Sequence, residues 1–118
     1  MENSNENSRI IRRRALQYNL PVVDLESAET VGRIGDLTLD GIMLICPKAV
    51  QTGRTFNLHL ELPSEILSCR KIDFEARSLW CKPDINPQFF TAGFQFVKLP
   101  AKTMEVIMGL IVQYGEKK

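Results

Sequence analysis

Hydrophobic and polar positions alternate with a period of two over most of this chain, as expected for β-strands with one buried face. Residues 54–62 are the clearest case, because Phe56, Leu58 and Leu60 alternate with polar neighbours. Stretches rich in glycine, proline and polar residues separate the alternating segments and are typical of turns. The pattern predicts six strands, at residues 16–23, 30–37, 42–46, 54–62, 71–82 and 89–97.

The hydrophobic period becomes helical only near the C-terminus. Pro100 suits the first turn of a helix, and the apolar residues that follow predict one amphipathic helix over residues 100–114. We expect its apolar stripe, which contains Met104 and Met108, to pack as core against the mouth of a barrel formed by the strands. We do not expect this stripe to form a groove for a partner protein.

The order of these elements predicts the fold class. Six closely spaced strands without crossover helices, followed by one helix, favour a mainly β fold. We expect a six-stranded antiparallel β-barrel over residues 16–97, with the C-terminal α-helix packed on it. Since side chains fill a barrel of this size, a ligand site must lie on its outside.

Length and charge narrow the class further. The 118 residues fit a single domain, and the formal net charge of +1 argues against bulk binding of nucleic acid. No apolar run of the length of a membrane span and no signal peptide are visible, so we expect a cytoplasmic protein.

The residues most often found in metal and catalytic sites carry no such pattern here. Cys46, Cys69 and Cys81 are odd in number and widely spaced, which predicts reduced thiols and no disulfide or metal site. His59, the only histidine, falls on the solvent face of its strand and is interpreted as an ordinary surface residue. No nucleophile stands beside a base, so the sequence does not indicate an enzyme.

The N-terminal segment carries the first candidate chemistry. Residues 1–8 are polar and are expected to form a disordered tail. Residues 9–14 then form a flexible arm that holds four arginines, namely Arg9, Arg12, Arg13 and Arg14. Guanidinium groups match phosphate oxygens and the O6/N7 edge of guanine, and they stack on flat rings. The arm therefore predicts an anionic ligand that contains guanine.

Residues 36–41 carry the complementary chemistry. Asp36 and Thr38 offer a carboxylate and a hydroxyl, and Gly41 permits a positive φ or a close approach of the main chain. The same residue types also build ordinary turns, and we assign Asp40 to that structural role. Trp80 is expected to contribute to barrel packing, with stacking on a ligand base as the alternative.

Taken together, these two motifs resemble the PilZ domain, a bacterial receptor for the second messenger cyclic di-GMP (c-di-GMP). The R-x-x-x-R mark of that family is matched by Arg9 to Arg13, and its [DN]-x-S-x-x-G mark by residues 36–41, with Thr38 in place of serine. The phrases at residues 78–80 and 92–96 also look like the late strands of this family.

The resemblance implies a ligand site. Arg9 and Arg13 would bind a guanine edge or a phosphate, and Asp36 would accept hydrogen bonds from guanine N1 and N2. Thr38 would reach a phosphate or a base edge, and Gly41 would keep the backbone clear. Additional candidate contacts are Arg12, Arg14 and Trp80.

The resemblance also implies a function. The chain would be a nucleotide-binding signalling domain that relays c-di-GMP to a protein partner in motility, exopolysaccharide production or a related process, with no cofactor and no metal. One alternative is a PilZ-like adaptor that has lost the ligand and acts through protein contacts. The other is a small barrel that binds single-stranded nucleic acid, which the near-neutral charge and the lack of an exposed aromatic platform disfavour.

Overall fold

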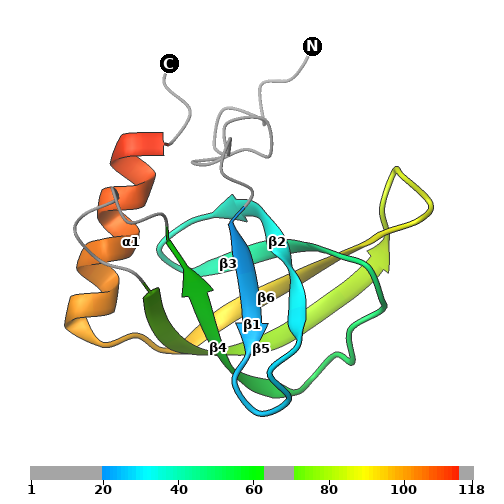
Figure 1. Cartoon of the computed structure of the whole chain (residues 1–118), viewed down its shortest axis with the longest axis horizontal. Coiled ribbons are helices and arrows are strands. Elements are labelled where there is room, and N and C mark those ends of the chain that lie inside the picture. Colours follow the sequence, from blue (N-terminus) through cyan, green and yellow to red (C-terminus); the bar gives the residue numbers. More distant parts are fainter. Residues whose placement is uncertain (1–19, 63–70, 115–118) are drawn as a thin grey trace.

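The computed structural model describes residues 20–62 and 71–114. These residues form a closed six-stranded barrel in which every neighbouring pair of strands is antiparallel, and one helix lies beside it (Figure 1). The predicted fold class is therefore confirmed. Around the barrel the strand order is β1-β2-β3-β6-β5-β4. The elements are β1 (Pro21–Asp24), β2 (Thr30–Leu37), β3 (Gly41–Cys46), β4 (Thr55–Glu61), β5 (Lys71–Pro83), β6 (Phe90–Lys98) and α1 (Ala101–Tyr114).

Three predicted segments lie outside the described residues. These are the tail at residues 1–8, the arginine arm at residues 9–14 and the start of the first strand at residues 16–19. Where the chain becomes described, the carbonyl of Leu20 accepts a hydrogen bond from the amide of Ile34 at 3.0 Å. The described part of the chain therefore begins alongside β2.

Side chains on the inward faces of the strands fill the interior of the barrel. Leu44, Leu58 and Ala76 are fully buried. Edge-on ring contacts join Phe56 to Phe94 and Phe74 to Phe96, with centroid distances of 5.7 and 5.3 Å. This core explains the period-two pattern of the sequence. It also agrees with the expectation that a ligand site must lie on the outer surface.

A β-bulge in β5 changes which face of the strand points inward. Before the bulge, the buried residues alternate down to Ser78, and the register then shifts between Ser78 and Trp80. The extra residue, Leu79, breaks the alternation, so that both Leu79 and Trp80 are exposed. Trp80 therefore lies on the outer face of the barrel, where it packs against Gly93 of β6. Beyond this point the hairpin of β5 and β6 projects from the barrel (Figure 1).

The helix packs on the barrel through a face that overlaps the predicted one but leaves out both methionines. Its buried residues are Thr103, Val106, Ile107 and Leu110, whereas Met104 and Met108 are 40% and 47% exposed. The prediction that both methionines belong to the core is wrong. The hydroxyl of Thr103 donates a hydrogen bond to the carbonyl of Asp73 in β5 at 3.3 Å, which turns that face toward the barrel.

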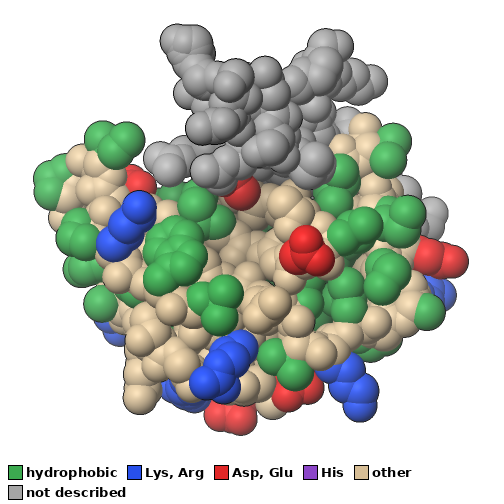
Figure 2. Space-filling view, turned by 180° about the vertical axis from the view of Figure 1, so that it is seen from behind, with side chains coloured by type: hydrophobic (Ala, Val, Ile, Leu, Met, Phe, Trp, Pro, Cys, Tyr) green, Lys and Arg blue, Asp and Glu red, His purple; other side chains and the backbone are tan. Residues whose placement is uncertain are grey.

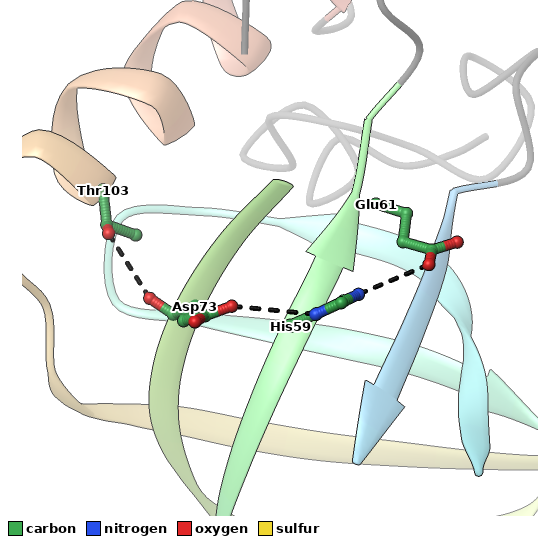
Figure 3. A network of polar contacts seen from close by, with 4 residues as sticks. All are labelled: His59, Glu61, Asp73 and Thr103. Atoms are coloured by element: carbon green, nitrogen blue, oxygen red, sulfur yellow. Dashed lines mark hydrogen bonds and ion pairs between the residues drawn. The ribbon is translucent and has the colours of Figure 1, made fainter. Parts of the chain in front are cut away.

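His59 lies on the outer face of β4, as predicted, but it is not an ordinary surface residue. Its side chain is only 14% exposed and lies between two carboxylates (Figure 3). Its Nε2 is 3.4 Å from Glu61 Oε2, and its Nδ1 is 3.7 Å from Asp73 Oδ1. Since the main chain of Asp73 also accepts the bond from Thr103, this polar network extends from β4 to the start of α1.

Candidate functional site

A hollow of about 300 Å³ lies on the outer wall of the barrel, between the turn that joins β2 to β3 and the middle of β5 and β6. We call it the Trp80 hollow. It gathers three of the predicted site residues, Asp36, Thr38 and Gly41, together with Trp80. Its described lining residues are Asp36, Thr38, Asp40, Gly41, Ile42, Met43, Leu79, Trp80, Gly93, Phe94 and Gln95.

Thr38 holds the 36–41 turn together through its hydroxyl. The oxygen accepts hydrogen bonds from the amides of Asp40 and Gly41, both at 3.2 Å, and the hydroxyl donates to the carbonyl of Gly41 at 3.4 Å. The main-chain amide of Thr38 also donates to this carbonyl, at 3.0 Å. A threonine keeps the hydroxyl that a serine would supply, and here that hydroxyl shapes the turn.

The turn is also attached to β6. The carbonyl of Asp40 accepts a hydrogen bond from the amide of Phe96 at 3.0 Å. At Gly41, an added Cβ would collide with the main-chain carbonyl oxygen of Phe94. Among the described glycines only Gly53 has a positive φ. Gly41 is therefore needed for close approach of two strands, and not for the positive φ that its place in a turn suggested.

Asp36 lies next to a bulge in β2. The register of β2 and β3 shifts between Ile34 and Asp36, which leaves Gly35 as the extra residue and pairs Asp36 with Met43. Asp36 is half-buried and lines the Trp80 hollow. The bulge thus directs a carboxylate into the outer wall at the point where the strand enters the turn.

Trp80 forms the opposite wall of the hollow. It pairs with Gly93 across β5 and β6, and a Cβ on Gly93 would overlap the indole atoms Cε2, Nε1 and Cζ2. The indole therefore lies against the backbone of β6 at Gly93, yet the residue remains 39% exposed. The expectation that no aromatic platform is exposed is wrong at this residue. A glycine within a strand, as at Gly93, is the sequence signal that could have indicated this close approach.

The charge of the described lining is acidic. Asp36 and Asp40 contribute two carboxylates, and no lysine or arginine belongs to the described lining residues. Figure 2 shows this side of the molecule with acidic side chains between two groups of apolar ones, one toward α1 and one toward the projecting hairpin. An anionic ligand in this hollow would therefore need cations from adjacent parts of the chain.

A second hollow of about 300 Å³ lies between the turn that joins β1 to β2 and the loop that joins β3 to β4. Its lining includes Asp24, Lys48 and Arg54. The guanidinium of Arg54 stacks 4.4 Å from the ring centroid of Phe56 and lies 3.6 Å from Glu26. This hollow contains none of the predicted site residues, and it serves below as the alternative place for a ligand.

The described cysteines and acidic groups form no further chemical centre. Within residues 20–62 and 71–114, no three histidine, cysteine or acidic side chains are grouped as metal ligands, and Cys46 and Cys81 are free thiols. Burial, with a smaller effect of the neighbouring Cys81, raises the pKa of Cys46 to about 12. Cys69 lies outside the described residues. In the same two ranges, no helix has the length and apolar character needed to cross a membrane.

The arginines of the predicted site, Arg9, Arg12, Arg13 and Arg14, lie outside the described residues. The sequence placed Asp36, Thr38 and Gly41 in one candidate site, and these three residues line the hollow together. It missed Leu79, Gly93 and Gln95 on the facing strands, because a bulge and a strand pairing bring them there.

The structure is thus a small closed barrel whose outer wall carries a hollow lined by acidic and apolar residues. The family model of the PilZ domain matches residues 7–113. The chain therefore belongs to the PilZ domain family of c-di-GMP receptors. No curated protein sequence matches it significantly.

Solved structures share this fold at low sequence identity. The PilZ domain of YcgR from Escherichia coli, solved with c-di-GMP, superposes with a TM-score of 0.61 at 16% identity, covering 80% of this chain and 79% of that one. The inhibitor of motility MotI/DgrA from Bacillus subtilis gives 0.66 at 18% identity, covering 80% of this chain and 45% of that one. MrkH from K. pneumonia, in its apo state, gives 0.68 at 10% identity, with coverages of 97% and 52%. The chain thus spans about half the length of MotI/DgrA and of MrkH.

Proposed function

We propose that this protein is a receptor that binds c-di-GMP in the Trp80 hollow and passes the signal to a protein partner. The observation that supports the proposal is that the second family motif lines this hollow, close to the point where the described chain begins. Asp36, Thr38 and Gly41 line the hollow, and the described chain begins at Leu20, which is bonded to Ile34 of the same strand as Asp36.

Covalent geometry supports the arm as the other half of the site. Leu20 is seven positions after Arg13, and an extended chain of that length spans up to about 25 Å. Ile34, the partner of Leu20, is two strand residues or about 7 Å from Asp36. Arg13 is thus within reach of the hollow, and Arg9 has four more residues of reach.

The chemistry assigns each group a role. Asp36 accepts hydrogen bonds from guanine N1 and N2, and a bidentate contact of this kind contributes about 1–3 kcal/mol. Thr38 and Gly41 hold the turn that presents this carboxylate. Arg9 and Arg13 neutralise the phosphates and stack on the bases, with Arg12 and Arg14 as further cations. Closure of the arm over the ligand is the change that a partner protein detects.

A thermal shift experiment with c-di-GMP tests this function. A ligand at one hundred times its Kd stabilises the protein by about 2.7 kcal/mol. We expect Asp36→Ala and Arg13→Ala each to abolish this stabilisation without changing the circular dichroism spectrum. The matched controls are Glu105→Ala on the exposed side of α1 and Arg54→Ala in the second hollow, and both should keep the shift.

The outcomes separate the alternatives. If the unchanged protein shows no shift at saturating c-di-GMP, the proposal fails and the ligand-free adaptor is left. If Arg54→Ala loses the shift and Asp36→Ala keeps it, the ligand binds in the second hollow. Because Trp80 is exposed, binding of single-stranded nucleic acid has one observation in its favour. Displacement of an oligonucleotide by c-di-GMP in a gel-shift assay decides that point.

A further inference from the structure

Lys82 contacts a lining residue of the Trp80 hollow, because its ammonium lies over the indole of Trp80. The Nζ atom is 5.4 Å from the centroid of the Trp80 ring. Trp80 and Lys82 are two residues apart in β5 and both are exposed, whereas Cys81 between them packs toward the core. The two side chains therefore project from the same outer face of the strand.

The indole offers this ammonium a weak, exchangeable contact. The Trp80 ring lies against Gly93, so the ring has little freedom to move toward β6. A cation over the ring is attracted by the negative face of the indole. Among the residues that the structure describes, no carboxylate lies within ion-pair distance of Lys82. Its ammonium instead makes a cation–π contact with the Trp80 ring. The positive charge of Lys82 is thus not already neutralised by an acid of this part of the chain.

The hollow needs such a charge. Its described lining includes no lysine or arginine, and the carboxylate of Asp40 would repel a dianionic ligand. The ammonium of Lys82 contacts Trp80, itself a lining residue, and so stands next to the same space. A lysine ammonium is a compact charge on a flexible stem, and it moves easily from one partner to another.

We propose that Lys82 is a phosphate-binding residue of this receptor. When the nucleotide enters the hollow, the ammonium moves from the indole to a phosphodiester oxygen, because a hydrogen bond between two charged groups is stronger than an exposed contact with a ring. The inference rests on the proposed function, and it adds a cation from the barrel wall to those of the arm. It also predicts that the environment of Trp80 changes on binding.

Calorimetric titration of the full chain with c-di-GMP tests the role of Lys82. We expect Lys82→Gln to weaken binding about 10-fold and to reduce the dependence of the affinity on salt, since one ion pair is lost. Lys82→Arg should bind within about threefold of the unchanged protein, because the charge is kept. Lys98→Gln is the matched control, since it removes an exposed lysine at the far end of β6 and should change the affinity by less than about twofold.

Fluorescence gives a second reading, because Trp80 is the only tryptophan of the chain. Its emission should change with c-di-GMP at the same concentrations that give the calorimetric curve. If the unchanged protein binds and Lys82→Gln binds equally well, or if emission stays constant during binding, the inference is overturned and the proposed function stands. If the unchanged protein does not bind c-di-GMP at all, both are overturned.

Discussion

Two glycines, Gly41 and Gly93, keep the Trp80 hollow in its present shape, because an added Cβ at either one would collide with a neighbour. At Gly41, an added methyl group would meet the carbonyl oxygen of Phe94, which belongs to the backbone of the paired strand. At Gly93, it would meet the indole of Trp80, which is a side chain. The first obstacle can be relieved only by separating two strands, whereas the second can be relieved by removing one ring.

This difference makes a prediction about stability. Gly93→Ala should lower the free energy of unfolding by about 1–3 kcal/mol, as overpacking does, because the added methyl displaces the indole. In the Trp80→Ala background, the same change should cost close to nothing. Urea denaturation of the four proteins of this cycle measures the coupling. Equal costs in both backgrounds would show that Trp80 does not lie on Gly93.

The sequence was enough to predict which polar side chains the 36–41 turn would carry. Asp36 and Thr38 were recognised as polar groups of one turn, and they line one hollow. The hydroxyl of Thr38, however, bonds within the turn, so its part in the site is to shape it. A sequence motif gives the presence of a hydroxyl but not the direction of its hydrogen bonds.

At the scale of the element, α1 shows how two overlapping stripes compete in one helix. The stripe predicted from apolar residues alone includes Met104 and Met108. The buried residues of the helix are instead Thr103, Val106, Ile107 and Leu110. Thr103 breaks the apolar pattern and is nevertheless buried, because its hydroxyl has a carbonyl partner in β5. A period count cannot identify this partner, since the partner is on a distant strand.

Neighbouring residues of α1 therefore differ in their importance for stability. Ile107→Ala should destabilise the protein by about 2–4 kcal/mol, because the side chain is 1% exposed and its removal leaves a cavity. Met108→Ala should cost less than about 0.5 kcal/mol, because the methionine is 47% exposed and alanine favours the helix. Chemical denaturation of both variants compares the two faces directly. If Met108→Ala lowers the stability more than Ile107→Ala does, Met108 belongs to the core, as the sequence pattern predicted.

Strands were predictable to within one or two residues wherever the alternation was regular. Residues 30–37 were expected as a strand and are β2, and residues 71–82 were expected and form most of β5. The bulge at Leu79 was not predictable from periodicity, because the apolar residues continue through it while the inward face changes. That change is what exposes Trp80, so the feature that matters most for the site is the one that the pattern conceals.

For the whole molecule, the closed barrel gives the site its rigidity. Each strand pairs with two neighbours, so the 36–41 turn is fixed by β2 and β3 and by its bond to Phe96 of β6. Such a site on a rigid wall binds with little rearrangement of the barrel itself. In the proposed complex the arginine arm encloses the ligand, the barrel wall supplies Asp36 and Trp80, and the Lys82 ammonium moves from the indole to a phosphate.

The location of the bound nucleotide tests the account most directly. In a two-dimensional amide spectrum of the ¹⁵N-labelled protein, saturating c-di-GMP should shift the amides of residues 36–41, of Gly93 and of residues 9–14, together with the indole N–H of Trp80. The amides around Lys48 and Arg54 in the second hollow should stay in place. Binding that shifts the second hollow and leaves the 36–41 turn and Trp80 unchanged would contradict the account.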